Sequence, residues 1–226
     1  MIIKEVKCND KNLLDAVNIF NDLNIKYFLA NGSLLGLIRD GDLLPWDNEI
    51  DLVIFKSDLN LVLFKILKKK FKIKNFKYVQ GNFDSKHIKF KRNEGRVIDI
   101  NIGFKTFQKN NEIFITQYCL FTKKNLNFFL KFIIFFFNKL KKIFGIFILF
   151  QNLRLKLFKY LDLFDKVEYN IPEKFLFNFI HIKINNTLIN IPKEYEEVLK
   201  AIYGNSWVKK IDKKEYYKKL LPSSKN

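Results

Sequence analysis

The stretch FLANGSLLGLIRDGDLLPWDNEIDLVIF, residues 28–55, decides the fold of this chain. Its pattern predicts a hydrophobic strand over residues 26–30, a tight turn at residues 31–33 and a short apolar helix over residues 34–38. A loop then leads to a second apolar strand over residues 52–55. Three acidic residues stand at the start of that second strand: Asp47, Glu49 and Asp51.

The spacing of these acidic residues suits a metal ion. Alternate side chains of a strand share a face, so Glu49 and Asp51 point one way while the apolar residues between and after them enter the core. Two neighbouring carboxylates repel each other unless a cation lies between them, and hard oxygen ligands suit Mg²⁺ or Mn²⁺. We therefore predict Mg²⁺ (or Mn²⁺) as a cofactor, with Asp47 and Trp46 supporting the ligands from the preceding loop.

The turn before the short helix is suited to a phosphate. Backbone N–H groups and the helix dipole favour an anion there, Gly32 lets the backbone approach, and Ser33 adds a hydroxyl donor or a helix cap. Arg39 would either neutralise phosphate charge or pair with an acidic neighbour. The acidic neighbours in question are Asp40, Asp42 and Asp47. A metal clamp and a phosphate cradle on one segment indicate metal-assisted phosphoryl transfer, whereas a plain helix cap followed by solvated carboxylates is the structural alternative.

Three blocks of this segment resemble the signature of the LicD family, relatives of fukutin. GSLLG at residues 32–36, Arg39 and PWDNEID at residues 45–51 match a pattern of roughly GTLLG, Arg and PWDDDID. IPKEYEEVLKAIYGNSW at residues 191–207 is similar to the family's closing pattern of Pro, Tyr, Leu and Tyr-Gly. The resemblance implies an α+β fold of the nucleotidyltransferase superfamily, which is a mixed β-sheet flanked by helices.

The resemblance also implies an activity. Family members transfer a phospho-alcohol, such as phosphocholine or phosphoribitol, from a CDP-linked donor to a cell-surface glycan or a lipid-linked sugar. Two departures stand out: Asp47-Asn48-Glu49 replaces a run of three aspartates, and Asp40 stands where the family often has histidine. The longer arm of Glu49 shifts or relaxes the ion's position, and Asp40 bears on substrate choice more than on reaction type.

Superfamily members carry a third carboxylate on a later strand, and Asp99 is the candidate here. In GRVIDINIG, residues 95–103, Asp99 faces away from the alternating isoleucines. A solvent-facing carboxylate is the alternative interpretation. The resemblance implies that Glu49 and Asp51 hold one ion, while Asp99, with Asp51, holds a second ion or orients the acceptor hydroxyl. The predicted catalytic and metal-binding residues are therefore Glu49, Asp51 and Asp99, and the predicted donor-phosphate residues are Gly32, Ser33 and Arg39.

Composition points to anionic partners without choosing among them. The net charge of +18 and the sequence pI near 9.7 suit sugar phosphates, anionic lipid or nucleic acid, of which we expect the first two and no nucleic acid.

Cys8 and Cys119 lack zinc-ligand spacing and predict buried thiols in a reducing compartment. The N-terminal residues lack an apolar signal region, so we expect a cytoplasmic protein at the inner face of a membrane.

Residues 128–150, FFLKFIIFFFNKLKKIFGIFILF, predict a helix whose apolar surface is interrupted by lysines. An amphipathic helix lying in the headgroup zone of an anionic membrane fits this pattern, with a buried helix and a true span as alternatives.

The predicted organisation is a nucleotidyltransferase-like catalytic core over residues 1–120, a basic helical insertion over 121–165, and a C-terminal part over 166–226 that completes the core domain.

The remaining patterns predict further elements. Helices are expected over residues 10–24 with Asp10 as cap, over 58–70 with Ser57 as cap, and over 194–203 ending at Gly204. Strands are expected over residues 76–79, 87–91, 96–104, 113–117 and, as one or two strands, 180–191, with a turn at 109–111 joining 96–104 to 113–117.

Two other functions remain open from the sequence. A nucleotidyltransferase acting on a small molecule or RNA would use the same superfamily site but attack the α-phosphorus of a nucleoside triphosphate. A non-catalytic membrane- or nucleic-acid-binding protein would use the positive charge alone.

Overall fold

The structure, a computed structural model, describes residues 2–80, 87–102, 105–109, 112–122, 127–144, 157, 160–161, 164–210, 212 and 215. The chain divides into two compact units. The first comprises Met1–Gln117 with Tyr169–Lys213, and the second comprises Tyr118–Glu168 with Lys214–Asn226. All the predicted site residues lie in the first unit. The predicted domain boundaries at residues 120 and 165 stay a prediction.

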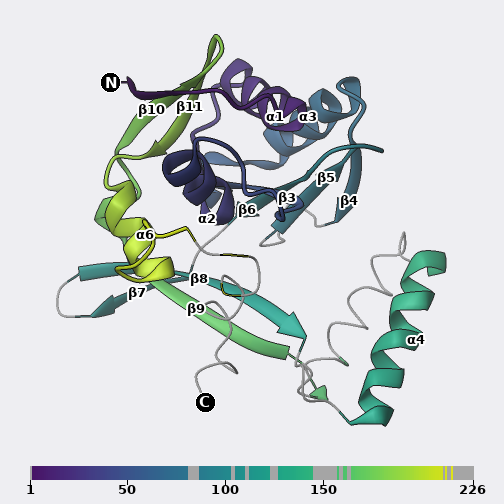
Figure 1. Ribbon diagram of the computed structural model, residues 1–226. Coiled ribbons are helices and arrows are strands. Elements are labelled where there is room, and N and C mark those ends of the chain that lie inside the picture. Colours follow the sequence, from purple (N-terminus) through teal and green to yellow (C-terminus); the bar gives the residue numbers. More distant parts are fainter. Residues whose placement is uncertain are drawn as a thin grey trace. The chain divides into compact units, whose positions relative to one another are not determined.

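A five-stranded mixed sheet forms the centre of the first unit (Figure 1). Its order is β2-β3-β6-β5-β4; β3 and β6 run parallel, and every other neighbouring pair is antiparallel. The strands are β2 (Tyr27–Leu29), β3 (Glu49–Ile54), β6 (Val97–Ile102), β5 (His87–Lys91) and β4 (Lys77–Gln80). This mixed sheet with flanking helices confirms the predicted α+β fold.

Two helices cover one face of this sheet, α1 (Lys11–Asp22) and α3 (Leu61–Ile73) (Figure 1). The Asp10 carboxylate caps α1 as predicted by accepting a hydrogen bond from the Leu13 N–H. The predicted cap of α3 at Ser57 is wrong, because the Asn60 side chain accepts the Leu63 N–H and the helix begins at Leu61. The preceding residues Lys56–Asp58 form a single 3₁₀ turn instead.

The core lies between these helices and the apolar side of the sheet. Ile50 and Leu52 of β3 and Ile98 and Ile100 of β6 have no exposed surface. Their alternation with polar residues leaves the opposite side of both strands free for the acidic side chains.

A second sheet in the first unit has the order β1-β10-β11. Its strands are β1 (Ile2–Val6), β10 (Phe179–Ile184) and β11 (Thr187–Pro192), followed by the helix α6 (Tyr195–Tyr203). The predicted strand pair around residues 185–186 is confirmed, since β10 and β11 form an antiparallel hairpin. Gly204 follows α6 with φ of +77°, which confirms it as the C-terminal cap.

The third sheet has the order β7-β8-β9, formed by β7 (Lys105–Lys109), β8 (Glu112–Thr122) and β9 (Phe164–Pro172). The antiparallel partner of β8 is β7, so the predicted pairing of residues 96–104 with 113–117 is wrong. That strand, β6, belongs to the five-stranded sheet instead. The turn residues 110–111 lie outside the described residues.

The predicted phenylalanine-rich helix is confirmed as α4 (Phe128–Phe144), and residues 145–150 lie outside the described residues. Among the helices that the structure describes, none combines the length and the apolar character needed to cross a membrane.

Gly36 packs against the backbone of the following loop, and this contact leads to a stability prediction. A Cβ atom added at Gly36 would lie 2.6 Å from the Asp42 carbonyl oxygen and 2.8 Å from the Leu44 nitrogen, although its φ of −61° suits any residue. We expect Gly36→Ala to lower the free energy of unfolding, measured with urea, by about 1–3 kcal/mol through overpacking. Gly41→Asn is the control, because Gly41 has open space around it and asparagine tolerates its φ of +76°. Equal stability of Gly36→Ala and wild type would contradict this packing.

Candidate metal centre

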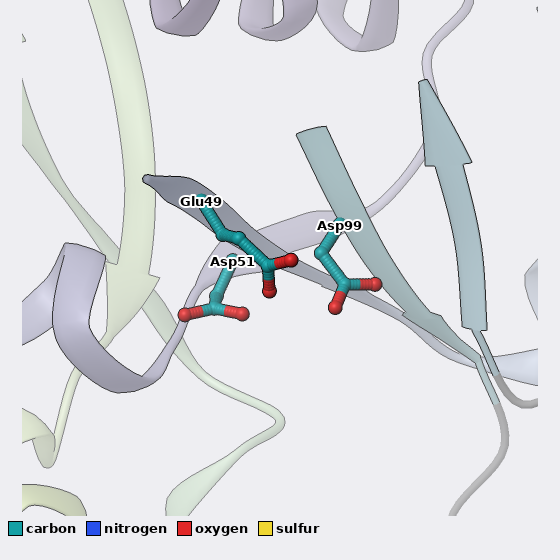
Figure 2. A group of neighbouring side chains, drawn as sticks. All are labelled: Glu49, Asp51 and Asp99. Atoms are coloured by element: carbon teal, nitrogen blue, oxygen red, sulfur yellow. The ribbon is translucent and has the colours of Figure 1, made fainter. Parts of the chain in front are cut away.

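Three carboxylates from two adjacent parallel strands converge on the polar side of the five-stranded sheet. Asp51 of β3 lies directly opposite Asp99 of β6, and Glu49 precedes Asp51 by one pleat repeat. Figure 2 shows all three side chains on the same side of the two strands. One oxygen of each carboxylate lies within 4.8 Å of the others, so the predicted grouping of Glu49, Asp51 and Asp99 is present.

The segment quoted at the start holds Asp51 in place. Its backbone N–H donates to the Ser33 Oγ at 2.9 Å, and its carbonyl oxygen accepts from the Ala30 N–H at 3.1 Å.

The helix α2 (Asn31–Leu35) begins three residues earlier than predicted, and the π-helical turn Gly36–Asp40 continues it. Glu49 and Asp51 lie within β3 rather than just before the strand, because β3 begins at Glu49.

Arg96 anchors the loop that leads into β3. Its guanidinium contacts the Asp10 carboxylate at 2.6 Å, the Asp47 carbonyl oxygen at 2.9 Å and the Leu44 carbonyl oxygen at 3.2 Å. The Asn48 carbonyl oxygen also accepts the Val97 N–H at 2.8 Å. These bonds tie the loop to β6 and to the start of α1, so Arg96 positions the loop.

Arg92 has a similar structural role beside the N-terminal half of α1. Its guanidinium donates to the Asp15 carboxylate, to the Asn12 side chain at 2.8 Å and to the Lys74 carbonyl oxygen at 2.8 Å. Burial opposes ionisation of Asp15, but the hydrogen bonds from Arg92 and Lys11 outweigh it and lower the pKa of Asp15. Arg92 is therefore occupied by α1 and α3, away from the acidic cluster.

Sequence analysis missed Lys89, which lies inside the acidic cluster. Lys89 is on β5 opposite Asp99, and its Nζ lies 2.6 Å from Glu49 Oε1 and 2.9 Å from Asp99 Oδ2. His87, on the same strand and face, has its Nδ1 3.4 Å from Asp99 Oδ1. The alternation of HIKFK was visible in the sequence, but only the pairing of β5 with β6 brings Lys89 and His87 to Asp99.

Asp51 carries the greatest electrostatic cost in the cluster. Burial, followed by the charges of Asp99, Asp47 and Glu49, raises the pKa of Asp51 well above its usual range. Burial also raises the pKa of Asp47, whose Oδ1 accepts the Glu49 N–H at 3.2 Å. Among the residues that the structure describes, no hydrogen bond or ion pair reaches the Asp51 carboxylate.

Asp99 and Lys89 are affected in the opposite sense. Burial favours the neutral form of Asp99, but hydrogen bonding to His87 and the charge of Lys89 outweigh it and lower its pKa. Burial would likewise lower the pKa of Lys89, but the charges of Asp99 and Glu49 raise it. Both groups are therefore charged at neutral pH.

The predicted donor-phosphate residues do not lie in one group. Gly32 and Ser33 are buried in the first turn of α2, where Ser33 contacts Asp51. Arg39 forms two hydrogen bonds to the Asp40 carboxylate, at 2.8 and 2.7 Å, and a third to the Lys209 carbonyl oxygen at 3.3 Å. Pairing with Asp40 was one of the alternatives that the sequence left open.

The acidic cluster fits a divalent cation. Its donor set consists of hard carboxylate oxygens, and among the described residues only the charge of Lys89 offsets the repulsion that Asp51 meets from Asp99, Asp47 and Glu49. Glu49, Asp51 and Asp99 could hold such an ion, with Ser33 and Arg96 fixing the backbone on which two of them stand.

One comparison with known proteins identifies the family of this chain. The model of the LicD/FKTN/FKRP nucleotidyltransferase domain matches residues 24–141, just over half of the chain, and this range includes every residue of the acidic cluster. A comparison with curated protein sequences gave no match. Among solved structures, the lincomycin-bound crystal structure of the lincosamide antibiotic adenylyltransferase LnuA is similar with a TM-score of 0.44 and 10% identity, over 95% of this chain and 97% of that chain. The family match spans both strands that carry the carboxylates, and the chain therefore belongs to the LicD/FKTN/FKRP family and is a transferase with that family's nucleotidyltransferase domain.

Proposed function

We propose that this chain transfers a phospho-alcohol, such as phosphocholine or phosphoribitol, from a CDP-linked donor to a hydroxyl of a glycan or a lipid-linked sugar. Membership of the family supports a transferase of this kind. The observation that carries the proposal is the convergence of Glu49, Asp51 and Asp99 from two parallel strands beside the start of α2.

We assign the metal to these three carboxylates, with Mg²⁺ or Mn²⁺ as the ion. A bound divalent cation would neutralise charge on the donor diphosphate and so lower the barrier to phosphoryl transfer. The Ser33 hydroxyl accepts the Asp51 N–H and keeps its own hydrogen available to a donor phosphate, which the Gly32 backbone can approach closely. Because Arg39 is held by Asp40, we assign the donor phosphate to Gly32 and Ser33 first.

The test is incubation of the purified protein with Mg²⁺ and a panel of CDP-linked alcohols, with CMP release as the readout. We expect CMP release with at least one donor, and its loss in Glu49→Gln. The control is Asp22→Asn, since Asp22 is an exposed carboxylate at the end of α1. Pyrophosphate release from nucleoside triphosphates, with no CMP release from any CDP-linked alcohol, would instead establish nucleotidyl transfer.

We further propose that α4 binds the surface of an anionic membrane. Its exposed phenylalanines recur at helical spacing along one face. The side chains of Phe128 and Phe135, for example, are 85% and 57% exposed. The other members of this face are Phe129, Phe132 and Phe136. Residues 113–161 contain nine lysines and arginines and no acidic residue, which complements anionic headgroups.

Liposome sedimentation tests the membrane proposal. We expect binding to vesicles containing phosphatidylserine, and weaker binding to vesicles of phosphatidylcholine alone. Replacing Phe128, Phe129 and Phe132 with serine should lower the bound fraction at least about tenfold, because three apolar side chains no longer enter the headgroup zone. Phe177→Ser is the control, since Phe177 is 53% exposed but lies outside α4. Equal sedimentation with both kinds of vesicle, or no effect of the triple substitution, would contradict the proposal.

A further inference from the structure

Lys89 lies within the acidic cluster, in a position that a second metal ion could otherwise occupy. It is on β5, the strand next to β6 on the side away from β3, and it is paired with Asp99. Its ammonium group spans the two carboxylates at the edge of the cluster, 2.6 Å from Glu49 Oε1 and 2.9 Å from Asp99 Oδ2. The side chains of Lys89 and Asp99 are 21% and 7% exposed, so their contact is shielded from solvent, whereas Glu49 is 41% exposed.

The contacts divide the cluster into two parts. Asp99 has both oxygens near a donor, because Oδ2 faces Lys89 and Oδ1 lies 3.4 Å from the ring of His87. Glu49 has one oxygen on Lys89. The Asp51 carboxylate, in contrast, has no hydrogen bond or ion pair among the described residues. Lys89 therefore supplies positive charge directly between Glu49 and Asp99, whereas its ammonium group makes no ion pair with Asp51.

The formal charges then limit the number of ions. With all three carboxylates ionised, as metal ligands are, the carboxylates and the ammonium group sum to −2, which a single divalent cation neutralises. A second divalent cation would leave the same group of side chains with a surplus of positive charge and would lie close to the Lys89 ammonium.

We propose that Lys89 is the permanent second cation of this site, so that the protein binds one divalent ion, beside Asp51. This inference rests on the proposed metal-dependent function and deepens it. Because Lys89 takes the place of a second ion, Asp99 is left to flank the single ion together with Glu49 and Asp51 and to orient the acceptor hydroxyl, which is the other role that the resemblance allows it. Lys89 is a positioning residue that fixes Glu49 and Asp99 without exchanging with solvent as a bound metal ion would.

The test is a titration of the protein with Mn²⁺, in which electron paramagnetic resonance counts the bound ions. We expect one ion per wild-type chain and two per Lys89→Met chain, with the first ion bound at least about tenfold more tightly in the variant because a nearby positive charge is gone. Lys89→Arg, which keeps the charge, should bind one ion. Lys91→Met is the matched control, since Lys91 is exposed on the same strand and should leave both the number of ions and the affinity unchanged.

The outcomes distinguish a failure of the role proposed for Lys89 from a failure of the metal-dependent function. Two ions on the wild-type protein, or one ion with unchanged affinity on Lys89→Met, would overturn the role of Lys89 while leaving the metal-dependent transferase intact. No bound Mn²⁺ on the wild-type protein would overturn the metal site itself, and the role of Lys89 with it. If Lys89→Met fails to fold, as judged by circular dichroism, Lys89→Gln provides the same removal of charge with a polar side chain.

Discussion

Replacing Asp51 with asparagine is expected to lower CMP release by at least about 10³-fold, because the side chain loses the charge that holds a metal ion worth several kcal/mol to phosphoryl transfer. The fold should survive, since the Ser33 contact uses the backbone N–H of residue 51 rather than its side chain. Asp22→Asn removes an exposed carboxylate of α1 and should retain wild-type turnover.

The same substitution should raise stability in the absence of divalent ions. Burial and neighbouring charges raise the pKa of Asp51 in the folded protein, so its ionised form disfavours folding at any pH above the ordinary pKa of aspartate. Asparagine removes that cost, and we expect a higher Tm for Asp51→Asn than for wild type at pH 7 in a chelating buffer. A lower Tm together with retained activity would show that Asp51 has a structural role instead.

Replacing Arg96 with methionine is expected to lower the free energy of unfolding by about 3 kcal/mol, because Asp10 Oδ2 and the Asp47 carbonyl oxygen lose their charged donor and the Leu44 carbonyl oxygen loses one of its two donors. The carbonyl oxygens belong to Leu44 and Asp47, in the loop that sets the start of β3. We therefore expect the folded fraction of Arg96→Met to show reduced CMP release as well. Urea unfolding and activity per folded molecule measure the two effects separately.

Arg92→Met is the matched control for this prediction. Arg92 also pairs with an acidic residue of α1, Asp15, but its other partners lie in α1 and after α3 rather than in the loop before β3. It should lose stability to a similar degree and keep wild-type turnover once folded. Equal losses of activity in both variants would show that Arg96 has no particular role in positioning β3.

The sequence predicted the site well where local pattern determines position. The alternation around Glu49 and Asp51, and around Asp99, placed these carboxylates on the polar faces of two strands. The Asp10 cap of α1 and the Gly204 cap of α6 also follow from neighbouring residues alone.

Prediction from the sequence failed where the pairing of strands distant in sequence determines the structure. Residues 113–117 were predicted to pair with residues 96–104, but their antiparallel partner is β7, because a strand pattern does not specify its partner. Lys89 went unnoticed for the same reason, since only the antiparallel register of β5 and β6 brings it opposite Asp99. Several residues before α3 have cap-forming side chains, and Asn60 rather than Ser57 accepts the Leu63 N–H in the first turn.

The central claim, that Glu49, Asp51 and Asp99 together hold a divalent ion, is tested most directly by crystals grown with Mn²⁺ and measured for anomalous scattering. We expect one anomalous peak in contact with the Asp51 carboxylate and flanked by Glu49 and Asp99, absent from crystals of Asp51→Asn. No peak among these carboxylates at saturating Mn²⁺, or a peak that persists unchanged in Asp51→Asn, would contradict it.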